Sequence, residues 1–133
     1  MPQGTKGKVV FFDTTARDGK QAPGNNFSPE DTVRLARQLA KMGVDIMEAG
    51  FPISSDADFQ SVHDVATQIG GIRVCALARA ESEDIIAAVR ALDGALNSPR
   101  VHTFIASSDE HVRVKFREDP DAVVAMAVQS IEQ

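Results

Sequence analysis

The chain has 133 residues, of which 43% are hydrophobic and 25% charged, and this length suits one globular domain with a buried core. A formal net charge of -5, without a cluster of lysine or arginine, argues against a nucleic-acid partner. No apolar run approaches the roughly 20 residues that span a bilayer, and the N-terminus holds no apolar signal-peptide segment, so we expect a cytoplasmic protein without a membrane partner.

The chain begins with an apolar run at residues 9–12, which predicts a strand covered on both faces. This run breaks abruptly into a polar loop at residues 13–24. In parallel α/β folds, ligands bind at such carboxyl ends of strands. A helix is then predicted from Ser28 to Gly43, because serine followed by proline favours a helix start and glycine favours a helix end.

The rest of the chain alternates strands and helices with a nearly constant period. Helices are predicted after Ser54 or Ser55, after Glu81 and after Asp119, each with acidic residues or proline in its first turn. The predicted strands are residues 9–12, 44–50, 72–77 and 100–106. Four consecutive βα units fit either half of an α/β barrel of the TIM type or a small open parallel sheet, and the period alone does not choose between them.

Polar side chains fall at the predicted carboxyl ends of these strands, which meet on one face of a parallel sheet or barrel. Arg17 and Asp18 place a fixed cation beside a carboxylate, as expected where a divalent metal and a carbonyl substrate are held together; a surface ion pair is the alternative. Glu48 lies in a mostly apolar strand and therefore needs an arginine or hydrogen-bond partner. His102 either orients a substrate carbonyl or is a satisfied core histidine. Other polar residues at strand ends are Asp13, Thr14, Arg79, Thr103, Ser107 and Ser108.

The sequence shows no evident complete metal site. A lone aspartate does not hold a catalytic divalent ion, and the histidines at 63, 102 and 111 form neither a close pair in a strand nor an i, i+4 pair on a helix. There is no glycine-rich phosphate loop and no Gly-x-Ser-x-Gly elbow. Cys75 is the single cysteine and lies in an apolar run, which indicates a buried, inert thiol and excludes a disulfide framework.

Residues 12–24, FDTTARDGKQAPG, closely resemble the first-strand signature of the 2-isopropylmalate synthase family, whose usual form is FDTTLRDGEQSPG. Three further segments agree with the same family in the same order. GVDIMEAGFP at 43–52 is similar to its second strand, VCALARA at 74–80 to its third and VHTFIASSDEH at 101–111 to its fourth. Families that make homocitrate or citramalate share the first signature, but EAGFP and HTFIA fit the isopropylmalate type better.

The resemblance implies a metal-dependent TIM barrel, an acyltransferase that condenses acetyl-CoA with 3-methyl-2-oxobutanoate to give 2-isopropylmalate and CoA in leucine biosynthesis. It implies that Asp18 is a ligand of Mn²⁺ or Mg²⁺ and that Arg17 contacts the oxo acid and polarises its carbonyl. It also implies that Leu77 and His102 line the oxo-acid pocket, the first as an apolar wall and the second as a polar contact. Glu48 is expected to brace Arg17 in catalysis.

The sequence departs from the family signature at three positions. Ala16 replaces leucine, Lys20 replaces glutamate and Ala22 replaces serine. We expect Ala16 to remove an apolar anchor beside Arg17, and we expect Lys20 to add positive charge near a metal site.

The resemblance places residues 1–133 in the N-terminal half of a barrel domain. The family's His-x-His metal ligands, its second half-barrel and its leucine-sensing domain lie outside this sequence. Two functions therefore stay open: the enzyme activity of the family, or a catalytically inactive half-barrel that only binds or associates. A half-barrel leaves apolar strand edges open, so we expect a homo-oligomer or association with a complementary half.

Overall fold

A computed structural model describes residues 7–116 and 119–132 of the chain. We predict no signal-peptide segment at the start of the chain. Residues 1–6 of that stretch lie outside the described residues. The described residues form one parallel sheet in the order β1-β2-β3-β4, which confirms the predicted series of four βα units. The strands are β1 (Phe12–Asp13), β2 (Ile46–Gly50), β3 (Arg73–Arg79) and β4 (Arg100–Phe104).

Helices follow the strands in the predicted order. The longer helices are α1 (Pro29–Met42), α2 (Asp56–Gln68), α3 (Ser82–Ala91) and α5 (Pro120–Glu132). The short helical segments are η1 (Gly19–Gln21), η2 (Pro52–Ser54), α4 (Asp109–His111) and the π-helix η3 (Val112–Phe116).

Local chemistry explains the ends of α1. The Ser28 hydroxyl accepts the backbone N–H of Asp31 at 3.1 Å, and the Asp31 carboxylate accepts the backbone N–H of Ser28 at 3.3 Å. This reciprocal pair satisfies two donors that the first helical turn would otherwise leave open. Gly43 ends the helix in the left-handed conformation with φ of 81°, which glycine adopts without a steric penalty. The predicted helix from Ser28 to Gly43 is therefore confirmed.

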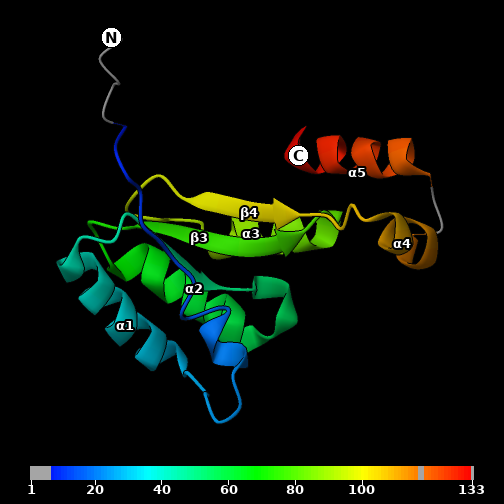
Figure 1. Cartoon of the computed structure of the whole chain (residues 1–133). Coiled ribbons are helices and arrows are strands. Elements are labelled where there is room, and N and C mark those ends of the chain that lie inside the picture. The colour runs from blue at the N-terminus through cyan, green and yellow to red at the C-terminus, as the bar shows by residue number, and fades with distance from the viewer. Residues whose placement is uncertain (1–6, 117–118, 133) are drawn as a thin grey trace.

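The two faces of the sheet differ in what covers them. Helices α1 to α3 lie together along one face (Figure 1). Buried apolar residues from both layers form the core between them: Ala36, Leu39, Met47, Ala49, Val62, Val65, Val74, Ala76, Ala78 and Ala88. Because side chains alternate along a strand, Glu48 in β2 and Cys75 and Leu77 in β3 point to the opposite face. Glu48 and Leu77 therefore lie on the face that α1 to α3 do not cover.

The first strand is shorter and more exposed than predicted. Only Phe12–Asp13 pairs with β2, whereas Val9 is 71% exposed and Phe11 63% exposed. The expectation of a strand buried on both faces at residues 9–12 is therefore wrong for the described chain. The physical reason is its place at the edge of the sheet, where β2 is its one neighbour and the N–H of Phe11 bonds to the Asp45 carboxylate instead of a ladder carbonyl.

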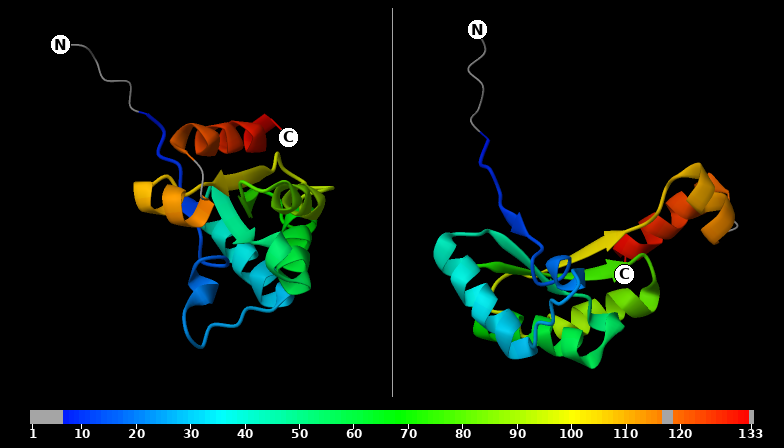
Figure 2. Two further views of the ribbon diagram at one scale, coloured as in Figure 1. Left: turned by 90° about the vertical axis from the view of Figure 1, so that its right-hand side faces the viewer. Right: turned by 60° about the horizontal axis from the view of Figure 1, so that its bottom comes forward.

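The last helix departs from the pattern of the first three. α5 lies beside β4, on the other side of the sheet from α1 and α2 (Figure 2). Val123 is buried, but the apolar residues Val124, Val128 and Ile131 remain exposed. This face of α5 therefore adds nothing to the main core. Among the described residues, no helix combines the length and apolar character needed to cross a membrane.

A charged pair ties α3 to the end of β3. Asp84 lies in the first turn of α3 and is only 2% exposed. Its carboxylate accepts the backbone N–H of Arg79 at 3.0 Å, the Nε of the same residue at 2.7 Å and its Nη2 at 2.9 Å. One carboxylate thus fixes both the main chain and the side chain of Arg79 where the strand turns into the helix.

Replacing Asp84 by asparagine tests this tie. The hydrogen bonds from Arg79 hold the pKa of the Asp84 carboxyl below its usual value, so the tie stabilises the fold above about pH 4 and is lost as pH falls through the folded-state pKa. We expect Asp84→Asn to lower the free energy of unfolding in urea by about 1 to 3 kcal/mol at neutral pH. The difference from the wild type should shrink in acid. The control is Glu83→Gln in the same helical turn, because Glu83 is exposed. Equal losses in both variants, or a difference independent of pH, would contradict the tie.

Candidate active site

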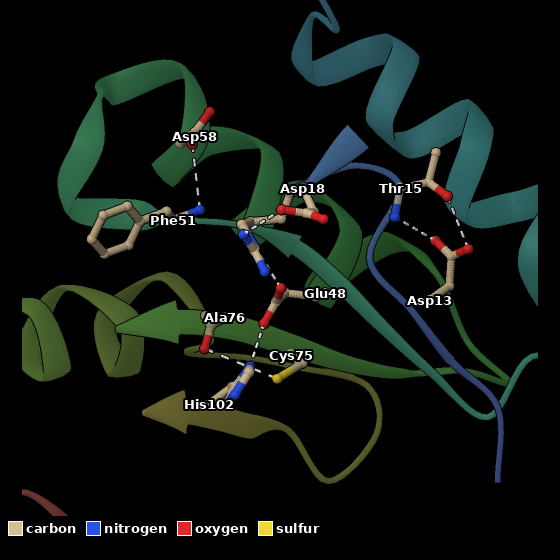
Figure 3. Close-up of polar contacts among 10 residues, drawn as sticks. Asp13, Thr15, Asp18, Glu48, Phe51, Asp58, Cys75, Ala76 and His102 are labelled. Carbon is tan, nitrogen blue, oxygen red and sulfur yellow. Dashed lines mark hydrogen bonds and ion pairs between the residues drawn. The ribbon is translucent and has the colours of Figure 1, made fainter. Parts of the chain in front are cut away.

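The centre of the site is a fully buried carboxylate with two partners. Glu48 is 0% exposed in the middle of β2. Its Oε2 accepts the Nε–H of Arg17 at 2.6 Å. Its Oε1 lies 2.7 Å from Nδ1 of His102 (Figure 3). The predicted arginine partner of Glu48 is therefore confirmed. The structure also adds His102, which the sequence did not connect to Glu48.

The two partners reach Glu48 from opposite sides along the sheet. Arg17 comes from the turn after β1, and His102 comes from β4, which pairs with β3. Because a carboxylate accepts hydrogen bonds but does not donate them, the ring of His102 carries a hydrogen on Nδ1. This leaves Nε2 for another contact, and the His102 side chain is 41% exposed. His102 is thus neither a fully buried core histidine nor a loose surface residue.

Asp18 lies next to Arg17 but has a different environment. Its Oδ1 accepts Nη1 of Arg17 at 3.1 Å, and its side chain is 63% exposed. Carboxylate oxygen suits Mn²⁺ and Mg²⁺, but no group of three or more His, Cys, Asp or Glu residues that could hold a metal occurs within residues 7–116 and 119–132. The described residues do not by themselves form a metal site. The role of Asp18 as a metal ligand remains a prediction.

Two apolar residues, Leu77 and Phe12, lie next to His102. Leu77 is its register partner on β3 and is 7% exposed. The Phe12 ring stands edge-on to the imidazole, with centroids 5.9 Å apart and planes at 77°. Cys75, two residues before Leu77, is fully buried, as the sequence predicted. The sequence did not identify Phe12 as a site residue, because its apolar run indicated only a strand.

Two of the signature departures have defined surroundings in the structure. Ala16 is 2% exposed and belongs to the main core, so it still anchors the turn beside Arg17, although with a smaller side chain than leucine. Lys20 pairs with the Asp58 carboxylate at 2.5 Å. Its charge is thus paired with that of Asp58, near the start of α2.

Two other polar residues at strand ends, Arg79 and Asp13, are held by local contacts. Arg79 is held by Asp84, and its guanidinium carbon lies 5.8 Å from the centre of the Phe51 ring. The Asp13 carboxylate accepts both the backbone N–H and the hydroxyl of Thr15 at 3.0 Å. None of these contacts among the described residues joins the cluster around Glu48.

Comparison with known proteins places the chain in a family. The profile of the HMGL-like family matches residues 8–133, so the chain belongs to the HMGL-like family. A solved structure titled as HMG-CoA lyase from Bacillus subtilis superposes on 94% of this chain and 42% of its own length, with a TM-score of 0.67 and 21% sequence identity. This neighbour has the TIM-barrel fold, which confirms the α/β fold of the TIM-barrel type.

Curated relatives carry a more particular name. The chain is 48% identical over 126 residues to "2-isopropylmalate synthase" of Syntrophus aciditrophicus, covering 95% of this chain and 24% of the relative. It is 50% identical over 127 residues to the protein of that name in Nitrosospira multiformis, covering 96% and 25%. The resemblance found in the sequence is therefore confirmed. The chain spans about a quarter of the length of these curated relatives.

The reactivity of the Cys75 thiol tests how tightly the sheet face that carries Glu48 is packed. Burial, and then the carboxylate of Glu48, raise the pKa of the Cys75 thiol to about 12. We expect Cys75 to react with Ellman's reagent at pH 8 at least about a hundredfold more slowly in the folded chain than in urea, because reaction needs both thiolate and access. The unfolded chain is the control. Comparable rates in the two states would contradict the packing of Cys75.

Proposed function

We propose that the chain supplies the oxo-acid-binding part of a 2-isopropylmalate synthase active site. In the overall reaction, acetyl-CoA, 3-methyl-2-oxobutanoate and water give 2-isopropylmalate and CoA. The observation that carries the proposal is the buried Glu48 carboxylate, which holds Arg17 and His102 at the same face of the sheet. The curated relatives of that name support it.

Arg17 is proposed to bind the carbonyl oxygen of the oxo acid. Its Nε donates to Glu48 and its Nη1 donates to Asp18, whereas Nη2 has no protein partner among the described residues. Negative charge develops on the carbonyl oxygen when the acetyl carbon attacks the neighbouring carbon. A guanidinium fixed beforehand stabilises this charge without reorganising during the reaction. Glu48 acts through Arg17 and is therefore a positioning residue.

His102 and Leu77 are proposed to hold the rest of the oxo acid. With Nδ1 engaged by Glu48, the Nε2 of His102 is left to contact a polar group of the substrate. Leu77 and the ring of Phe12 flank the imidazole and offer apolar surface to a branched alkyl group. A pocket of this kind distinguishes 3-methyl-2-oxobutanoate from smaller oxo acids by the apolar area it buries.

A divalent metal is part of the chemistry that the relatives imply. When bound, such an ion supplies Lewis-acid polarisation of the substrate oxygens. Asp18 is proposed to contribute one carboxylate ligand, and the described residues do not complete the site. The roles of Arg17, His102 and Leu77 given above do not depend on the ion.

A second candidate function is association without catalysis. The described sheet has two edge strands, β1 and β4, and the apolar residues Val9, Phe11 and Phe104 near these edges are 71%, 63% and 49% exposed. Exposed edges of this kind pair with other chains. A binding module that forms a homo-oligomer, or joins a complementary half, would use these edges.

Replacing Arg17 by lysine tests the proposed enzyme function. CoA release is followed with Mn²⁺ or Mg²⁺, acetyl-CoA and 3-methyl-2-oxobutanoate. We expect Arg17→Lys to reduce the rate about a hundredfold, because lysine cannot bond Glu48 and the developing oxyanion with the same fixed fork. Arg34→Lys is the matched control, since Arg34 lies 79% exposed on α1.

The same assay separates the two candidate functions. If the purified chain releases no CoA, the assay is repeated after adding a chain that carries the family's His-x-His segment. If that mixture also releases no CoA, the enzyme proposal is contradicted. An oligomer seen by light scattering, together with the absence of CoA release, would support the association module.

Shortening Leu77 tests the apolar wall without requiring turnover. We expect Leu77→Ala to weaken binding of 3-methyl-2-oxobutanoate about tenfold, measured by calorimetry, because the isopropyl group loses apolar contact. Pyruvate, which has only a methyl group there, should lose much less affinity. Equal losses for both acids would contradict the proposed wall.

A further inference from the structure

The turn that carries Arg17, residues 14–19, is held mainly by hydrogen bonds within the turn. The carbonyl oxygen of Thr14 accepts the backbone N–H groups of Arg17, Asp18 and Gly19 at 3.1, 2.7 and 3.3 Å. These bonds fix the shape of the turn but connect it to no other element. The turn therefore needs outside anchors if Arg17 is to stay in place.

Side chains from the turn provide three outside anchors. Ala16 packs into the core, and Arg17 bonds to Glu48. The third anchor is Lys20 in η1, whose Nζ lies 2.5 Å from Oδ1 of Asp58 in α2. The side chains of Lys20 and Asp58 are only 22% and 15% exposed, so this pair is more shielded than an ordinary surface ion pair.

Asp58 is itself held in place from several directions. Its Oδ2 accepts the backbone N–H of Phe51 at 3.3 Å and the hydroxyl of Ser54 at 2.8 Å (Figure 3 shows the Phe51 contact). Its backbone N–H donates to the hydroxyl of Ser55 at 3.1 Å. These hydrogen bonds hold the Asp58 carboxylate in place, so it does not move with the side chain of Lys20. Lys20 is thus attached to a fixed point at the start of α2.

We propose that Lys20 is a positioning residue that holds Arg17 against Glu48 by pairing with Asp58. The importance of Arg17 in this inference rests on the proposed function. Glu48 is buried, so lifting the turn would leave its Oε2 without a partner, and the Lys20–Asp58 pair opposes that movement. The usual glutamate of the family signature would place a second carboxylate near Asp58. The ion pair with Asp58 therefore depends on having lysine at position 20.

Hydrogen exchange of the Nε–H of Arg17, measured by NMR on the full chain, tests the anchor. We expect Lys20→Gln to raise this exchange rate roughly fivefold, because the turn opens more often when the charge is lost. Lys20→Arg keeps the charge and should stay within about twofold of the wild type. The matched control is Lys41→Gln, which removes the same charge at an exposed position near the end of α1 and should change nothing.

An unchanged exchange rate in Lys20→Gln would overturn the proposal. If that variant does not fold, Asp58→Asn carries the same test, because its amide oxygen can still accept from Phe51 and Ser54 while the charge is gone. The measurement needs no turnover, so it stands even if the chain releases no CoA. Conversely, a loss of CoA release in Lys20→Gln with unchanged exchange would overturn the anchor and leave the proposed function intact.

Discussion

Burial of the Glu48 carboxylate is the constraint on which the candidate site depends. An unpaired carboxylate inside a protein is costly, so β2 can keep one in its centre only if partners come from elsewhere. Arg17 comes from the turn after β1, and His102 comes from β4. The pairing therefore requires all four strands to be in register, and assembly of the sheet also assembles the site.

Charged pairs at the edge of the sheet fix the loops around this centre. Lys20 with Asp58 attaches the first turn to α2, and Arg79 with Asp84 attaches β3 to α3. Asp18 differs from these residues because its carboxylate is mostly exposed beside Arg17. The guanidinium of Arg17 is thus fixed by its partners, and the accessible carboxylate of Asp18 lies next to it. That combination suits a site in which a substrate oxygen and a cation meet.

Much of the fold followed from the sequence because local rules decide it. Ser28 and Gly43 bound α1 through capping and a left-handed glycine, and these interactions lie within a few residues. The exposure of residues 9–12 did not follow, because an apolar run does not reveal whether its strand is central or at an edge. The pairing of Glu48 with an arginine was predictable from the cost of burial. Its contact with His102, 54 positions later, depends on register, and so does the place of Phe12.

An NMR titration of the isotope-labelled chain with 3-methyl-2-oxobutanoate tests whether Glu48 holds Arg17 and His102 at one binding site. We expect the side-chain signals of Arg17 and His102 to shift together and give one dissociation constant, because Glu48 holds both groups at a single site. The exposed Arg34 on α1 serves as the internal reference and should not move. Shifts of only one of the two groups, or different dissociation constants for each, would show that Arg17 and His102 do not form a single site.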